Sequence, residues 1–121
     1  MQSNDIQRIR HIKRYCEDIV AYTERFGGFA EFVSDSAYHH AVSMCILQIG
    51  ELSNGLSAEF RNETKEIIQW GLVRGMRNWV AHSYTEMDNE IIWDTVSSSI
   101  PFLLQFCNKI LAQMPFADPT E

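Results

Sequence analysis

The sequence contains little that could hold a fold together covalently. Its 121 residues include only three cysteines, widely spaced and without a CxxC pair: Cys16, Cys45 and Cys107. Such an odd set is typical of reduced, buried thiols in a cytosolic protein. A chain of this length buries roughly 65–70% of its unfolded surface, so it needs neither disulfides nor a metal for stability. We therefore expect a single domain over residues 1–121, with frayed ends at 1–4 and 115–121.

Long apolar runs are also missing. No stretch approaches the roughly 18 apolar residues of a membrane span. The N-terminal sequence MQSNDIQRIRHIKRY lacks the apolar core of a signal peptide. We therefore expect a cytoplasmic protein that is not associated with a membrane.

Basic residues are scarce, with 10 Lys and Arg against 16 Asp and Glu and a net charge of −6. This balance argues against a general DNA-coating protein, whose affinity depends on many cationic contacts to phosphates. Residues 1–83 are nearly neutral, whereas residues 84–121 are acidic and carry Lys109 as their one basic residue. We interpret the acidic last third as a solvated face, and a small local basic site for RNA remains compatible with it.

No stretch shows the sustained alternation of a β-strand, and apolar residues recur at helical spacing instead. A first helix is predicted from about 3 to 26, ended by Gly27 and Gly28. A second opens at the N-cap cluster 34–36 and continues to about Leu52.

A third helix is predicted from about 62 to 82, with Thr64 as a candidate cap. Its two glycines, Gly71 and Gly75, indicate a bend or close packing. A fourth begins with Asp88 as N-cap and is kinked or interrupted near Pro101. Four amphipathic helices with mostly short connections predict an all-α, antiparallel four-helix bundle.

The segment RGMRNWVAHSY, residues 74–84, concentrates groups that can act on a phosphodiester. On a helix, Arg74, Asn78 and His82 share one face, whereas Arg77 lies about 140° around the axis from His82. A histidine can take the proton of the attacking 2′-OH or protonate the leaving 5′-oxygen. An arginine can hold the phosphorane oxygens, and an asparagine can orient the imidazole or the ribose. The same residue types also occur in purely structural polar clusters.

This segment resembles the R-x4-H-x-Y motif of HepT-like proteins, the toxin half of HepT–MNT toxin–antitoxin pairs in the HEPN superfamily (DUF86). Arg77, His82 and Tyr84 match its fixed positions, and Asn78 matches the usual R-N start. The segments IGEL, RGMRN and IIWDTV are also similar to the family in order and spacing. The resemblance covers roughly residues 5–112.

The resemblance implies a metal-independent endoribonuclease without a cofactor, acting as the toxin of a type II toxin–antitoxin pair. In that family the bundle dimerises, and the two motif helices face one cleft. We predict His82 as general acid/base, Arg77 as the clamp on the transition state and Asn78 as the orienting residue. Arg74 and Glu51 are candidate cleft residues, although a packing role for Glu51 is an equal alternative.

The resemblance also implies a partner, an MNT-type nucleotidyltransferase antitoxin that can transfer AMP to Tyr84. An adenylylated phenol two residues from His82 would block the groove and neutralise its arginines. The alternative is a non-catalytic helical adaptor that presents a substrate to the nucleotidyltransferase, and the acidic balance mildly favours it.

Other residues carry weaker patterns. Adjacent helical residues point about 100° apart, so His39 and His40 make a poor metal pair and are interpreted as surface or core histidines. Cys45 lies in an apolar run and is expected to be a buried thiol. The three tryptophans are interpreted as core or interface residues: Trp70, Trp79 and Trp93.

Overall fold

The computed structural model describes residues 3–81 and 86–113, and these residues form helices and no strand. In chain order the elements are α1 (Ser3–Phe26), α2 (Phe29–Ser34), α3 (Ser36–Asn54), α4 (Ala58–Thr64), α5 (Trp70–Ala81), α6 (Glu86–Asp94), the π-helical turn η1 (Thr95–Ser99) and α7 (Ile100–Ala112). The prediction of an all-α protein is therefore confirmed. None of the helices in this part of the chain is both long and apolar enough to cross a membrane.

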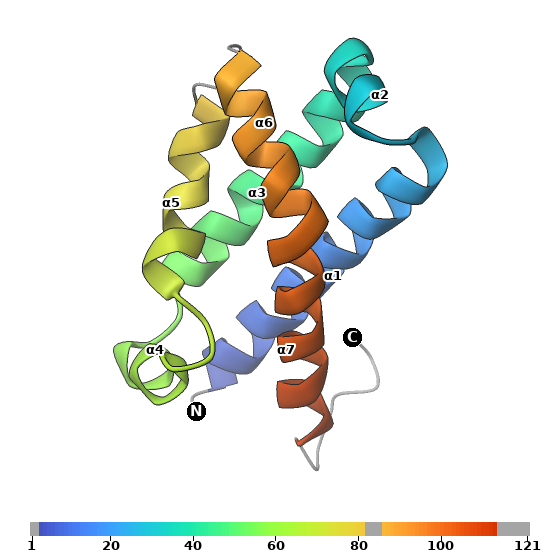
Figure 1. The fold of residues 1–121 in the computed structure, drawn as a ribbon. Helices are drawn as coiled ribbons and strands as arrows, with labels where there is room; N and C mark the ends of the chain where they lie inside the picture. Colours follow the sequence, from blue (N-terminus) through green and yellow to red (C-terminus); the bar gives the residue numbers. More distant parts are fainter. Residues whose placement is uncertain (1–2, 82–85, 114–121) are drawn as a thin grey trace.

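The long helices form a bundle around α3 (Figure 1). Helix α3 packs against α1 on one side and against α5 on the other, and α7 packs against α1. The short helices α2 and α4 lie at opposite ends of the bundle (Figure 1). Helix α3 therefore lies between α1 and α5, the helix on which the motif begins.

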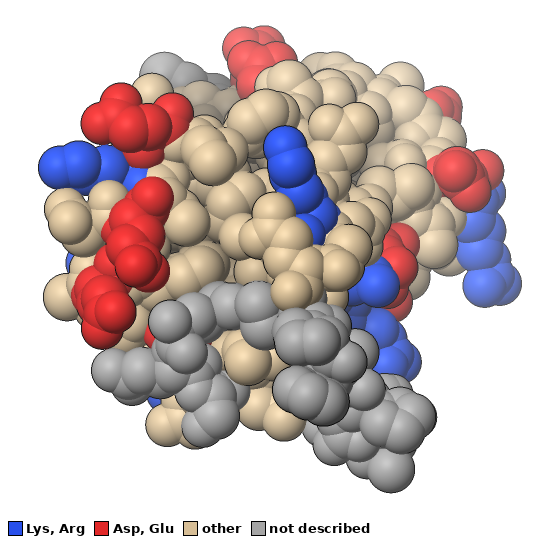
Figure 2. Space-filling view, turned by 90° about the horizontal axis from the view of Figure 1, so that it is seen from below, with Lys and Arg blue, Asp and Glu red and all other residues tan. Residues whose placement is uncertain are grey.

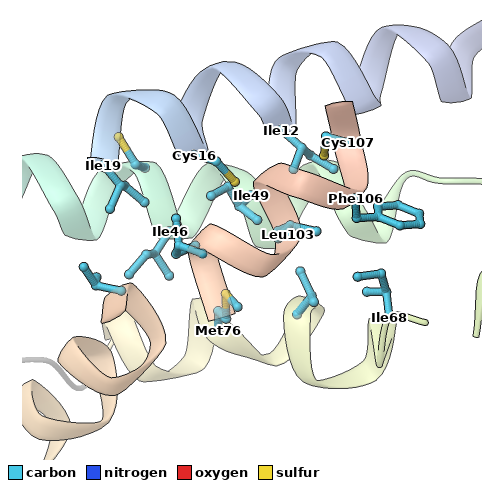
Figure 3. Packing of buried hydrophobic residues seen from close by; sticks show 14 of the residues in the cluster. Ile12, Cys16, Ile19, Ile46, Ile49, Ile68, Met76, Leu103, Phe106 and Cys107 are labelled. Atoms are coloured by element: carbon cyan, nitrogen blue, oxygen red, sulfur yellow. The ribbon is translucent and has the colours of Figure 1, made fainter. Parts of the chain in front are cut away.

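The core consists of the apolar stripes that the helical spacing predicts. Ile12, Cys16 and Ile19 of α1 face Ile46 and Ile49 of α3, and α7 covers them (Figure 3). The three cysteines are free and buried, as predicted. Burial raises the pKa of the Cys45 thiol to about 11 and that of the Cys107 thiol to about 12. These thiols therefore pack as small apolar side chains and do not supply a thiolate at neutral pH.

The first predicted helix ends, and the second begins, where the local sequence indicates. Gly27 follows the last residue of α1 and has φ of 111°, which glycine adopts without strain. The Asp35 carboxylate accepts hydrogen bonds from the amides of Ala37 and Tyr38, at 3.0 and 3.2 Å, and so caps α3. The sequence did not predict α2, a single short helix between them whose Phe32 is buried.

The third predicted helix, 62 to 82, is wrong as a continuous element. Helix α4 ends at Thr64, and α5 begins at Trp70. The Thr64 hydroxyl donates to the Phe60 carbonyl and accepts from the Trp70 indole N–H, both at 2.8 Å. Thr64 therefore closes α4 instead of capping the next helix, because its side chain is used in holding Trp70 at the start of α5.

The fourth predicted helix begins earlier than expected, at Glu86. Asp88 therefore lies inside α6, and the prediction that it is the N-cap is wrong. It continues through the π-helical turn into α7, with Pro101 in the first turn of α7. The Ile100 amide donates to the Thr95 carbonyl, which widens the helix directly before the proline. Proline lacks an amide hydrogen and crowds the preceding turn, so the interruption predicted near Pro101 takes the form of this wide turn.

Candidate functional site

Helix α5 carries Arg77 and Asn78, with which the motif begins, and it packs against Gly50 of α3. A β-carbon on Gly50 would lie 3.4 Å from the carbonyl oxygens of Val73 and Arg74 and 3.5 Å from the amide nitrogen of Arg77. A β-carbon at position 50 would therefore already be in van der Waals contact with the backbone of α5. The two helices thus pack closely at the turn of α5 that contains Arg74 and Arg77.

The close approach brings Arg77 and Glu51 together. The Arg77 Nη1 donates to Glu51 Oε1 at 2.9 Å, and their side chains are 39% and 52% exposed. A pair this accessible to water stabilises the fold by about 1 kcal/mol or less. Its main effect is geometric, because one guanidinium nitrogen is held while other N–H donors remain for an anion.

Arg74 and Asn78 lie one turn apart on α5. Arg74 is half-buried, and its Nε atom is buried without a hydrogen-bond partner among the described residues. Asn78 is exposed. A buried N–H without a partner costs about 1–3 kcal/mol, and the described residues supply no acceptor that would offset this cost at Arg74.

Two predicted site residues, His82 and Tyr84, lie outside the described residues. Helix α5 ends at Ala81 and α6 begins at Glu86, so the structure describes the framework on both sides of them. It brings Glu51 into contact with Arg77 and places Arg74 and Asn78 within one turn of Arg77 on α5. The predicted relation between Arg77 and His82 stays a prediction.

Sequence reasoning missed a polar contact between α3 and α6. His39 Nε2 lies 2.7 Å from Asn89 Oδ1, although the two residues are 50 positions apart. The neighbouring His40 is exposed, so the pair splits into one surface histidine and one engaged histidine. Residue spacing offered no signal for this contact, because the contact depends on how α6 packs beside α3 in the folded chain.

Few groups in this part of the chain could bind a metal. The described residues contain no cluster of three or more His, Cys, Asp and Glu side chains that could hold an ion. On the face shown in Figure 2, Lys and Arg side chains stand at separate points among acidic ones. The chemistry that the described site can offer is therefore local: hydrogen bonds and positive charge from α5.

The protein is thus a helical bundle in which the R-x4-H-x-Y segment begins on α5. The sequence model of the family described as Ribonuclease HepT-like matches residues 12–110. The chain therefore belongs to the HepT-like ribonuclease family. No solved structure matches the chain.

The similar curated proteins carry ribonuclease names. A protein of Caldanaerobacter subterraneus subsp. tengcongensis, named as an RNase, is 32% identical over 105 residues, which are 85% of this chain and 90% of that protein. A Methanocaldococcus jannaschii protein, also named as an RNase, is 27% identical and covers 98% of this chain and 97% of its own. A Thermococcus cleftensis protein, named as a ribonuclease HepT, is 31% identical over 78% of this chain and 90% of its own.

Proposed function

We propose that this chain is the toxin of a type II toxin–antitoxin pair and cleaves RNA without a metal ion. The observation that carries the proposal is the Arg77 guanidinium, held by Glu51 in a half-exposed position five residues before His82. Membership of a ribonuclease family supports the same conclusion.

The proposed reaction needs three functions from the motif. His82 takes the proton of the 2′-OH as its oxygen attacks the adjacent phosphorus, or returns a proton to the 5′-oxygen that leaves. Arg77 holds the phosphorane oxygens with the donors that Glu51 does not use, and Asn78 orients the imidazole or the ribose. The bond from phosphorus to the 5′-oxygen breaks, and the product is a 2′,3′-cyclic phosphate.

The proposed enzyme is a homodimer in which two copies of α5 face each other. A β-carbon added to Gly71 or Gly75 would meet nothing within 4 Å, so this strip of α5 is open. At helical spacing the strip continues through Asn78 toward His82. Each glycine costs a helix about 1 kcal/mol relative to alanine, and close contact with a second copy would offset that cost.

The proposed regulator is an MNT-type nucleotidyltransferase that transfers AMP to Tyr84. The added phosphate and adenine would lie near Arg77 and compete with RNA for its donors. An intact mass of the co-expressed protein should then exceed the chain mass by whole AMP units. The gain should be absent from Tyr84→Phe, and no gain in the native chain would contradict the modification.

The central experiment incubates unmodified protein, checked by intact mass, with a labelled single-stranded RNA in EDTA. We expect cleavage with cyclic-phosphate ends by the native chain. Arg77→Ala and His82→Ala should each lose roughly 100-fold or more in rate. Arg14→Ala is the matched control, because Arg14 is an exposed arginine on α1 and pairs with Asp18 at 3.8 Å.

Two outcomes would contradict the proposal. Cleavage that persists in both motif variants would come from another site or a contaminant. No cleavage by any folded, dimeric form would favour the alternative, a helical adaptor for the nucleotidyltransferase, which the acidic balance of the chain supports.

A further inference from the structure

His39 joins α3 to the first turns of α6. The carboxamide oxygen of Asn89 can only accept a hydrogen bond, so the His39 ring donates to it from Nε2, at 2.7 Å. The Ser43 hydroxyl lies 3.5 Å from the other ring nitrogen, Nδ1. The hydrogen bond to Asn89 therefore has one defined direction, from α3 to α6.

The His39 ring is itself held in place. It stacks on the Phe32 ring of α2, with 4.7 Å between centroids and 28° between planes. Ser43, one turn further along α3, is buried below it. A ring confined by a stacking partner and by the Ser43 hydroxyl beside Nδ1 loses little further freedom when it binds Asn89, so the contact is well suited to fixing position.

Helix α6 is anchored again one turn later, at Trp93. The Trp93 ring lies 5.3 Å from Phe32 and 6.4 Å from Tyr38, edge-on to the latter. Apolar contacts thus hold the second half of α6, whereas His39 holds the first half. The His39 contact is the nearer of the two to Glu86, where α6 begins.

We propose that His39 is a positioning residue for RNA cleavage. By holding Asn89 it fixes where α6 begins, and so where the segment that carries His82 and Tyr84 rejoins the bundle. The other end of that segment leaves α5, which α3 holds through Gly50 and the Glu51–Arg77 pair. Helix α3 therefore sets both ends of the segment. The cleavage part of this inference rests on the proposed function.

The positioning role predicts a loss of rate rather than of RNA binding. A misplacement of about 1 Å in a reacting group can cost roughly 100-fold in rate, while contacts to phosphates elsewhere persist. We expect His39→Phe, which keeps a ring on Phe32 but removes the N–H donor, to lower kcat about tenfold or more. KM for a labelled single-stranded RNA should stay within about twofold.

Three further variants separate positioning from general damage. His39→Gln restores an N–H donor at a similar reach and should recover most of the rate. Asn89→Ala should lose as much as His39→Phe, and the double variant should lose no more, because both remove one hydrogen bond. His40→Phe is the matched control, since His40 is the exposed neighbour, and its rate should be unchanged.

Amide hydrogen exchange tests the inference without any activity. His39→Phe and Asn89→Ala should speed exchange in peptides covering residues 82–90, while peptides from α1 stay protected. Unchanged exchange there, or full activity in both variants, would overturn the inference. If the two variants exchange faster as expected but the native chain cleaves no RNA, the proposed function fails and the holding role of His39 stands. Should His39→Phe not fold, Asn89→Ala alone decides.

Discussion

At the scale of single residues, the candidate site pairs Arg77, the group proposed to bind phosphate, with the acidic side chain of Glu51. Glu51 orients Arg77 through a 2.9 Å hydrogen bond, yet its carboxylate also repels the RNA backbone that Arg77 is proposed to bind. The pair is accessible to water, so opening it costs little. The two roles considered for Glu51, cleft residue and packing residue, are therefore compatible. Glu51 pairs with Arg77 and also adds a negative charge to the candidate site.

This arrangement predicts that Glu51→Gln strengthens RNA binding. The amide oxygen of Gln still accepts from Arg77, so orientation is kept while one negative charge is removed. We expect the Kd for a labelled RNA to fall roughly three- to tenfold at low salt, with the gain shrinking as salt rises. The melting temperature should hardly change.

Glu59→Gln is the control, because Glu59 is an exposed acidic residue on α4, outside the site. Binding that is unchanged or weaker in Glu51→Gln, measured by fluorescence anisotropy, would mean that Glu51 does not lie beside bound RNA.

At the scale of helices, the sequence predicted those elements whose ends depend on nearby residues. Helices α1, α3 and α7 follow from apolar periodicity and from end signals such as Gly27 and Asp35, which act within a few residues. The break between α4 and α5 depends instead on the Trp70 indole reaching Thr64 and on the buried Asp5 binding Ser57, which caps α4. Such contacts compete with helix continuation and leave no periodic signal.

The candidate site divides in the same way. The motif residues Arg77, Asn78 and His82 could be selected from sequence because they are close together in the chain. The partner of Arg77 and the contact between His39 and Asn89 join elements that are distant in sequence. Their pairing follows from the helix arrangement, which periodicity alone does not specify.

The packing of α3 on α5 predicts different effects of a larger side chain at two glycines. Gly50→Val should lower the free energy of unfolding by about 1–3 kcal/mol, because its β-carbon already reaches van der Waals distance from α5 backbone atoms, at 3.4 Å, and its two methyl groups extend beyond that point. Gly71→Val, whose β-carbon meets nothing within 4 Å in the single chain, should change it by less than about 1 kcal/mol. Urea unfolding at protein concentrations where the chain is monomeric measures both. Equal effects at the two positions would show that Gly50 does not set the helix spacing.

At the scale of the whole molecule, an acidic protein that handles RNA needs its positive charge concentrated. The chain carries −6 overall, and basic side chains are scattered on the face shown in Figure 2. Arg74 and Arg77 supply two positive charges in the middle of α5. Two copies of α5 facing each other would double that charge within one groove, without changing the charge elsewhere.

The facing arrangement predicts that Gly75→Gln breaks the dimer and the activity together. Glutamine favours helix, so the chain should keep its helical circular dichroism, but its side chain would stand on the open strip of α5 where the second copy is proposed to pack. We expect light scattering to give a monomer mass, and cleavage to fall by tenfold or more, about the cost of losing one oriented group in the groove. Ala21→Gln, a change of similar size at an exposed position of α1, should stay dimeric and active. A Gly75→Gln protein that remains a fully active dimer would place the interface elsewhere on the bundle, and each α5 would then have to bind RNA with a single pair of arginines.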